Sequence, residues 1–110
     1  MKPLKPSLKE RKRYILFKVI SEFEIEKEKI FESVAKAGLQ FLGELGMAKM
    51  GLQVLPETYD QKDKTFIVRT GHKFVNETKS ALILIKEIDG RKVTLESVRV
   101  SGIVDKLKSN

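Results

Sequence analysis

The sequence contains no cysteine and no tryptophan, and its only histidine is His72. Without cysteine, neither a disulfide framework nor a thiolate metal site can form, and one histidine cannot supply a histidine cluster. The absence of cysteine also fits a reducing compartment. These absences exclude disulfide-stapled domains and metal sites built from thiolates or clustered imidazoles.

Long apolar segments are missing as well. No apolar run approaches the length needed to cross a bilayer, and the opening Met-Lys-Pro-Leu-Lys-Pro lacks the apolar stretch of a signal peptide. We therefore expect a cytoplasmic protein with no membrane partner. With 110 residues, 41% of them hydrophobic, the chain fits one domain with one modest core.

Positive charge is abundant and is concentrated at the N-terminus. Six of the first 13 residues are basic and only Glu10 is acidic, which accounts for +5 of the net charge of +7. Such a block points to a polyanion, although a tail that only aids solubility is an equally good interpretation. Because residues 1–11 also contain two prolines and no periodicity, they predict a flexible basic arm, followed by one domain over residues 12–110.

Residue patterns along the rest of the chain predict alternating strands and helices. The predicted elements are a strand over 13–23, a helix over 26–45, strands over 52–59 and 64–70, a helix over 73–87 and a strand over 92–101. Turns are expected at 60–63 and at Asp89-Gly90, and a short turn or helix at 104–108.

The first predicted helix carries a stripe of apolar residues at helical spacing. The stripe comprises Ile30, Val34, Phe41 and Leu45, with Phe31, Leu39 and Leu42 beside it. We expect this stripe to face the core. Gly43, Gly46 and Gly51 should end or bend the helix.

This order of elements, β-α-β-β-α-β, predicts an α+β ferredoxin-like fold. It has a four-stranded antiparallel sheet with two helices on one face, the second strand at an edge and the first and third strands central. Pro56 cannot donate a ladder hydrogen bond, so the strand over 52–59 belongs at an edge. The first strand has apolar residues on both faces, which suits a central position.

The two faces of the first strand carry different residue sets. Ile15, Phe17 and Val19 share one face, and Tyr14, Leu16 and Ile20 share the other; the pattern leaves open which set packs against the helices. An apolar open face invites a cover, either residues 103–108 or another subunit. The candidate partner-binding residues are Tyr14, Leu16, Ile20 and Ile67.

No residue set predicts a protein active site. His72 follows Gly71 with no obvious carboxylate or nucleophile beside it, so a loop histidine near a helix start is the better interpretation. Alternating glutamates at residues 22–28 are better explained as a solvated, helix-starting set than as a metal site. We predict no catalytic residue, no metal ligand and no cofactor bound by the protein.

The topology is shared with the RNA recognition motif, which stacks bases on aromatic residues of its sheet. Within the strand over 64–70, only Lys64 and Phe66 fit that motif's third-strand signature. We therefore expect the protein to contact mainly the phosphate backbone of the RNA. The candidate RNA-binding residues are Lys5, Lys9, Arg11, Lys12, Arg13, Arg69, Lys73 and Arg99. For each of them alone, a solvated surface charge is the better interpretation, and the prediction rests on the group.

Five segments, in their order and spacing, carry a resemblance over nearly the whole chain. They are Arg11-Lys12-Arg13-Tyr14-Ile15, the glycine-punctuated residues 42–48, Phe66-Ile67-Val68-Arg69, Ala81-Leu82 and residues 97–102. With these, the sequence resembles the ribonuclease P protein component 2 family of archaea, which is shared with eukaryotic ribonuclease P and ribonuclease MRP. After Ser101-Gly102 the family often continues Thr-Ile-Lys, whereas this chain has Ile103-Val104-Asp105.

The resemblance implies a protein that assists a catalytic RNA in removing 5′ leaders from precursor transfer RNA. It implies that the ribonuclease P RNA and its magnesium ions carry the hydrolysis. It also implies pairing with a TIM-barrel protein subunit, often in a two-plus-two assembly. The alternatives are a stand-alone RNA chaperone or ribosome-associated binder, which explains the charge, and a small-molecule sensor domain, which does not.

Overall fold

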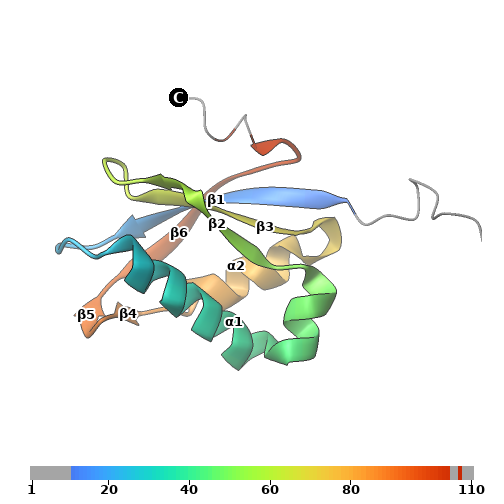
Figure 1. The fold of residues 1–110 in the computed structure, drawn as a ribbon, viewed down its shortest axis with the longest axis horizontal. Coiled ribbons are helices and arrows are strands. Elements are labelled where there is room, and N and C mark those ends of the chain that lie inside the picture. The colour runs from blue at the N-terminus through green and yellow to red at the C-terminus, as the bar shows by residue number, and fades with distance from the viewer. Residues whose placement is uncertain (1–10, 105–106, 108–110) are drawn as a thin grey trace, which may run out of the picture.

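The computed structural model describes residues 11–104 and residue 107, which form a four-stranded sheet, a small two-stranded sheet and a helical layer (Figure 1). In chain order the elements are β1 (Lys12–Ile20), α1 (Lys27–Met50), β2 (Gln53–Asp60), β3 (Thr65–Gly71), the 3₁₀ helix η2 (His72–Phe74), α2 (Val75–Ile83), β4 (Glu87–Ile88), β5 (Arg91–Lys92) and β6 (Thr94–Ser101). The predicted β-α-β-β-α-β order is confirmed, with the small hairpin β4–β5 added.

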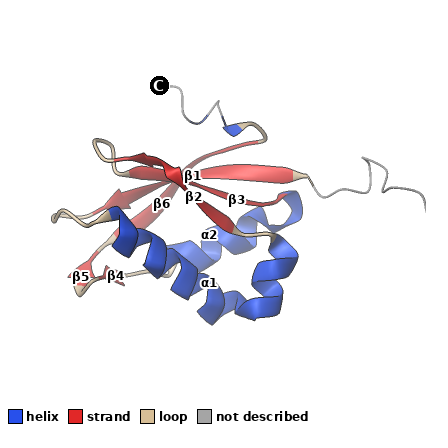
Figure 2. Cartoon of the chain, viewed as in Figure 1, coloured by secondary structure: helices blue, strands red, loops and turns tan. Residues whose placement is uncertain are grey.

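The main sheet has the strand order β2-β3-β1-β6, and every neighbouring pair is antiparallel. Both α helices cover the same face of the sheet and leave the opposite face open (Figure 2). This is the predicted ferredoxin-like arrangement. The strand that contains Pro56 lies at an edge, and β1 and β3 are central, as expected from the sequence.

The core forms between the sheet and the two helices. Ile15, Phe17 and Val19 of β1 are buried there, which settles the face that the sequence had left open. The ring of Phe17 stacks on that of Phe66 in β3, with 5.9 Å between the ring centroids. Each such side chain contributes about 1.5–3 kcal/mol by leaving water, so the alternation in β1 fixes the register of the central strands.

Helix α1 is broken at Gly43, as expected from its glycines. Gly43 has φ 71° and ψ 171°, and the helix ends before Gly51, whose φ of 65° is left-handed. The expectation that Phe41 and Leu45 belong to the buried stripe is wrong, because they are 53% and 87% exposed. Phe41 lies beyond Ala37, the last core residue before the break, and the break then changes the direction in which Leu45 points.

Helix α2 is shorter than the predicted helix over 73–87. It ends at Ile83, and the chain then enters the two-residue strands β4 and β5, which pair across Asp89-Gly90. Both turn residues have positive φ, 55° and 75°, as a tight type I′ hairpin requires. The turn was predicted correctly, but strands of two residues carry no periodicity that could be recognised.

Strand β1 ends at Ile20, three residues before the predicted end. The chain turns because the backbone N–H of Phe23 donates to Ser21 Oγ at 3.1 Å. The ring of Phe23 then lies beneath the guanidinium of Arg91, 4.7 Å from it, so this aromatic residue contacts the small hairpin instead of extending the strand. Among the described residues, no helix is long and apolar enough to span a membrane.

Candidate nucleic-acid interface

The strand register arranges the side chains of the open face in rows across the sheet. We call two of them the Tyr14 row, which consists of Gln53, Arg69, Tyr14 and Ser101, and the Leu16 row, which consists of Leu55, Ile67, Leu16 and Arg99. The Tyr14 row lies nearer the start of β1. Both rows point away from the helices, because the alternate residues of β1 and β3 are buried in the core.

Several chain segments meet at the start of β1 and form a basic end. The N–H of His72 donates to the carbonyl oxygen of Arg11 at 2.8 Å, and Lys12 pairs with Gly71, so η2 begins beside the first described residues. We define the basic end as Arg11, Lys12, Arg13, Lys49, Arg69, His72 and Lys73.

Lys12 connects the basic end to helix α1. A Cβ at Gly51 would lie only 2.8 Å from Lys12 Nζ, which places this ammonium against the C-terminus of the helix. A cation there is stabilised by the negative end of the helix dipole. Lys49 in the last helical turn adds a second positive charge at the same place.

Two arginines of this end are held by hydrogen bonds. Arg13 Nη1 donates to the carbonyl oxygen of Lys12 at 3.1 Å, and its guanidinium lies against Gly102. Arg69 Nη2 donates to Gln53 Oε1 in the neighbouring strand. A guanidinium has five N–H donors, so each arginine keeps further donors for a phosphate while its position is already fixed.

The opposite end of the sheet, where β1 stops, has a different charge pattern. It is formed by the β1–α1 connection and the β2–β3 turn, and we call it the turn end (Figure 1). Asp60 Oδ1 accepts the N–H groups of Lys62 and Asp63, which closes the turn. Burial, and then the charges of Glu24 and Asp60, raise the pKa of Tyr59 there above its ordinary value.

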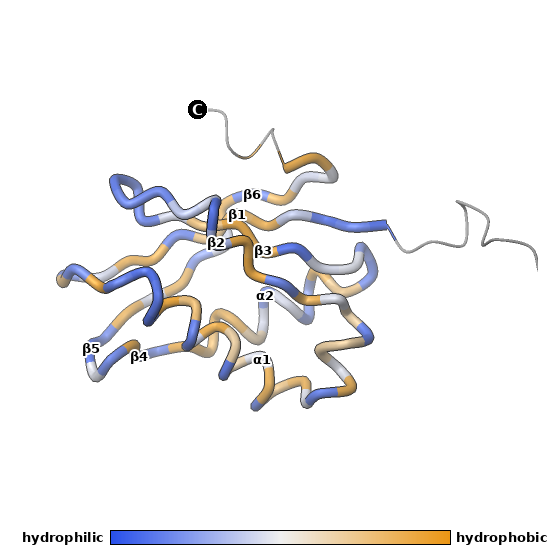
Figure 3. The backbone as a smooth tube through the Cα atoms, viewed as in Figure 1, coloured by the Kyte–Doolittle hydropathy of each residue, from blue (hydrophilic) through white to orange (hydrophobic). Residues whose placement is uncertain are grey.

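Figure 3 shows that the start of β1 and the β2–β3 turn are both hydrophilic. The two ends differ in net charge. Carboxylates offset the lysines at the turn end, whereas the basic end gathers cations. A polyanion is therefore attracted to one end of the domain.

The structure brings together most of the predicted RNA-binding residues that it describes. Arg11, Lys12, Arg13, Arg69 and Lys73 lie at the basic end, and Arg99 lies in the Leu16 row next to it. Lys5 and Lys9 lie outside the described residues, as do all residues of the predicted arm over 1–11 except Arg11. Lys49 was missed, although the predicted helix end near Gly51 could have pointed to it.

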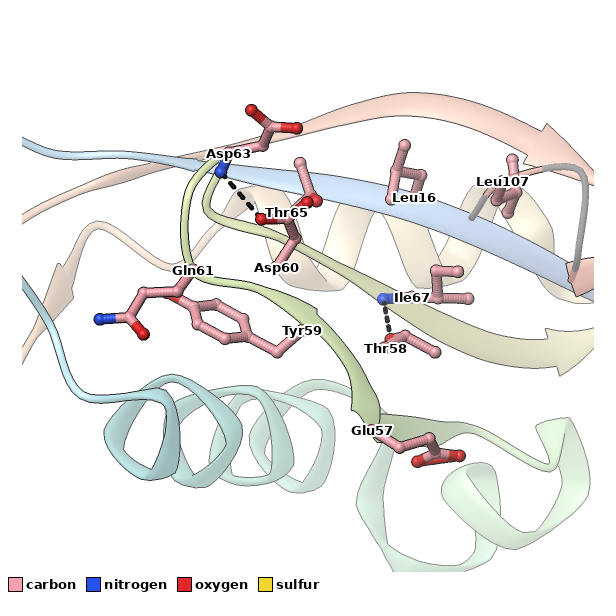
Figure 4. Close-up of a pocket in the computed structure, with 10 residues that line it drawn as sticks. All are labelled: Leu16, Glu57, Thr58, Tyr59, Asp60, Gln61, Asp63, Thr65, Ile67 and Leu107. Atoms are coloured by element: carbon pink, nitrogen blue, oxygen red, sulfur yellow. Dashed lines mark hydrogen bonds between the residues drawn. The ribbon is translucent and has the colours of Figure 1, made fainter. Parts of the chain in front are cut away.

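The candidate partner residues Tyr14, Leu16, Ile20 and Ile67 all lie on the open face. Figure 4 shows that Leu16 and Ile67 line a cavity of about 490 Å³ together with Leu107, which is 5% exposed. The C-terminal segment thus supplies an intramolecular cover at Leu107. Ile67 is only 1% exposed, whereas Ile20 remains 46% exposed.

A comparison with known protein families identifies the chain. The model of the Rpp14/Pop5 family matches residues 13–110. The chain belongs to this family. The match begins at Arg13, so it includes the Tyr14 row and most of the basic end. The resemblance drawn from the five sequence segments is confirmed.

Individual members of the Rpp14/Pop5 family align over nearly the whole chain. "Ribonuclease P protein component 2" of Pyrococcus furiosus is 38% identical over 97% of this chain and 88% of its own. The protein of that name from Thermococcus kodakarensis is 39% identical with the same coverage, and that from Methanocaldococcus jannaschii is 31% identical over 98% of this chain and 78% of its own.

A solved structure shares the fold. A chain in "Cryo-EM structure of yeast Ribonuclease MRP" superposes with a TM-score of 0.65 over 84% of this chain and 75% of that chain. Only 16% of the aligned residues are identical, so the similarity concerns the fold.

Proposed function

We propose that this chain is a protein subunit of ribonuclease P, the ribonucleoprotein that removes 5′ leaders from precursor transfer RNA. The observation that carries the proposal is the 38% identity to a ribonuclease P protein component 2 over 97% of the chain. So complete an alignment spans the sheet, both helices and the basic end together. It supports a common role for the whole domain.

Within the holoenzyme the subunit binds the ribonuclease P RNA through the basic end. Arg13 and Arg69 are already positioned by hydrogen bonds, so their guanidinium groups lose little freedom when they bind a phosphate. Each phosphate that is neutralised releases counterions, which favours binding at low salt. The RNA and its magnesium ions catalyse the hydrolysis, while the protein positions the RNA and neutralises part of its phosphate charge.

The protein partner in this proposal is the TIM-barrel subunit, in a two-plus-two assembly in the cytoplasm. Apolar surface on the described residues supports a protein contact. Ile20 is exposed on the open face, and Phe41, Leu42 and Leu84 line a groove between α1 and α2. Because Ile67 is buried beside Leu107, a partner on the sheet gains access to Ile67 only by displacing Leu107.

An omission experiment tests the proposed function. The ribonuclease P RNA of the same organism is reconstituted with its complete protein set or with this chain left out, and precursor transfer RNA cleavage is measured at moderate magnesium. We expect cleavage to fall strongly without the chain and to return when the chain is added back. Equal cleavage in both reactions would refute the proposal.

A further inference from the structure

Tyr14 occupies a singular position on the open face. It is half-buried in the central strand β1, with Arg69 of β3 on one side and Ser101 of β6 on the other. Directly opposed residues in an antiparallel pair have Cβ atoms about 4.5–5.5 Å apart, so Tyr14 and Arg69 are immediate neighbours. An aromatic residue and an arginine thus occupy neighbouring positions on this face of the sheet.

The guanidinium does not occupy the space next to the ring. Arg69 donates to Gln53 of β2, and the strand order β2-β3-β1 puts that partner on the side of β3 away from Tyr14. Unpaired bases stack both on aromatic rings and on arginine planes in RNA-binding proteins. The pair therefore offers two stacking groups, one of which is held in place by Gln53.

The neighbouring positions limit the site to a single base. The aromatic residue of β3, Phe66, is fully buried and stacks on Phe17 in the core, so it cannot serve as a second platform. In the adjacent Leu16 row, Leu16 and Ile67 are aliphatic and line a cavity with Leu107, so they offer no aromatic ring for stacking. A run of stacked bases, as on an RNA recognition motif, cannot continue along the sheet in that direction.

Positive charge surrounds this position on two sides. Lys12, two residues before Tyr14 in β1, lies on the same face of the strand, and Arg99 extends from the next row of β6. The phosphates on either side of a base stacked on Tyr14 would meet these two cations. A protein side chain in the same place would leave the cations without an anion, so the charges favour RNA.

We propose that Tyr14 and Arg69 form a binding site for one unpaired nucleobase of RNA, whose flanking phosphates contact the basic end. The inference rests on the proposed function in taking RNA as the ligand, and it extends it by assigning base contact to a specific residue. The basic end supplies sequence-independent backbone contacts, and Tyr14 distinguishes unpaired from paired RNA.

The fluorescence of Tyr14 tests this site directly. The sequence has two tyrosines and no tryptophan, so a Tyr59→Phe variant emits from Tyr14 alone. This variant is titrated with a single-stranded oligoribonucleotide of about 10 nucleotides and with a blunt RNA duplex of the same length. We expect the single strand to quench the emission and the duplex to leave it nearly unchanged. Binding of the single strand without quenching would overturn the inference.

Affinities of variants with both RNAs provide a second readout, measured by the anisotropy of labelled RNA. Tyr14→Leu should weaken single-strand binding about 10-fold and leave duplex binding unchanged, whereas Tyr14→Phe should stay within about two-fold. Ile20→Ala, on the same face of β1, is the matched control and should change neither affinity. Equal weakening of both RNAs by Tyr14→Leu would contradict a base contact.

The two proposals fail in different ways. If the omission experiment succeeds and Tyr14 is not quenched, the chain is a ribonuclease P subunit without this base site. If Tyr14→Leu does not fold, as thermal unfolding would show, the quenching titration of the Tyr59→Phe variant decides alone.

Discussion

Thr70 of β3 and Thr78 of α2 meet in the interior through a hydrogen bond of 3.1 Å between their hydroxyl groups, and both side chains are fully buried. The single hydroxyl proton of Thr78 is shared between Thr70 and the carbonyl oxygen of Phe74, which lies 2.8 Å from Thr78 Oγ1, and Thr70 Oγ1 donates to the carbonyl oxygen of Met50 at 3.4 Å. The pair thereby links α2, the central strand β3 and the C-terminus of α1. These three elements border the basic end, so the link helps to hold its cations in place.

Replacing either threonine with valine should destabilise the domain by about 1–3 kcal/mol, because the bond between the two hydroxyls is lost and one buried backbone carbonyl loses its side-chain partner. In the double variant Thr70→Val/Thr78→Val the loss should be smaller than the sum of the two single losses, since the bond between the two hydroxyls can be lost only once. Urea unfolding of the four proteins measures the coupling. Strict additivity would show that the two hydroxyls contribute independently.

Gly43 and Gly51 form a matched pair of backbone tests. Both have positive φ, 71° and 65°, so alanine should cost about 1 kcal/mol of stability at Gly51 and up to about 3 kcal/mol at Gly43, whose ψ of 171° is essentially restricted to glycine. A Cβ at Gly43 meets nothing within 4 Å, whereas one at Gly51 would lie 2.8 Å from Lys12 Nζ. We therefore expect Gly51→Ala alone to weaken RNA binding, by displacing Lys12. Equal RNA affinities of the two variants, measured at one salt concentration, would contradict this placement of Lys12.

The strands and the sheet order were predictable because they follow from short-range patterns. Alternation in β1 and the proline in β2 place their strands without any long-range information. The exposure of Phe41 and Leu45 was not predictable, since helical spacing assigns both to the apolar stripe. Their exposure depends on where the core ends and on the angle of the break at Gly43, and only the packed structure determines these.

The same division holds for the candidate site. The charge of the arm and of β1 could be read from the sequence, but the contact of Lys12 with the end of α1 joins residues far apart in the chain. Pairing of Tyr14 with Arg69 required the register of β1 against β3. The cover that Leu107 provides was left open between two alternatives, because apolar residues near a C-terminus do not show what they pack against.

Tyr59 should make stability depend on pH in the alkaline range. Burial, and then the charges of Glu24 and Asp60, raise the pKa of its hydroxyl above 10.0 in the folded protein. The folded state thus favours the neutral form, and its stabilisation is present below pH 10.0 and is lost as pH rises through the folded pKa. The difference in unfolding free energy between wild type and Tyr59→Phe should be constant up to about pH 9 and then shift against the wild type.

A constant difference from neutral pH to pH 11 would contradict a raised pKa of Tyr59. Lysines titrate in the same range, and the comparison of two proteins with the same lysines removes their contribution. Ultraviolet titration of the Tyr14→Phe variant, in which Tyr59 is the only tyrosine, measures the pKa of Tyr59 itself.

The cover at Leu107 should contribute measurably to stability. Leu107 is 5% exposed and lines the cavity with Leu16 and Ile67, so Leu107→Ala should cost about 1–2 kcal/mol and uncover apolar surface. Ile103→Ala is the control in the same segment, since Ile103 is largely exposed, and it should change stability little. Urea unfolding measures the cost, and binding of an apolar dye reports the uncovered surface. Equal effects of the two substitutions would argue against a specific cover.

The salt dependence of RNA binding tests the basic end as a whole. The triple variant Arg11→Ala/Lys12→Ala/Arg13→Ala removes three cations from it, so the slope of log affinity against log salt should fall by about two to three. The control is Lys27→Ala/Lys29→Ala/Lys62→Ala, which removes the same net charge from the turn end, where carboxylates offset the lysines. We expect its slope to match that of the wild type. If both triple variants flatten the slope equally, net charge governs RNA binding and the position of the cations does not.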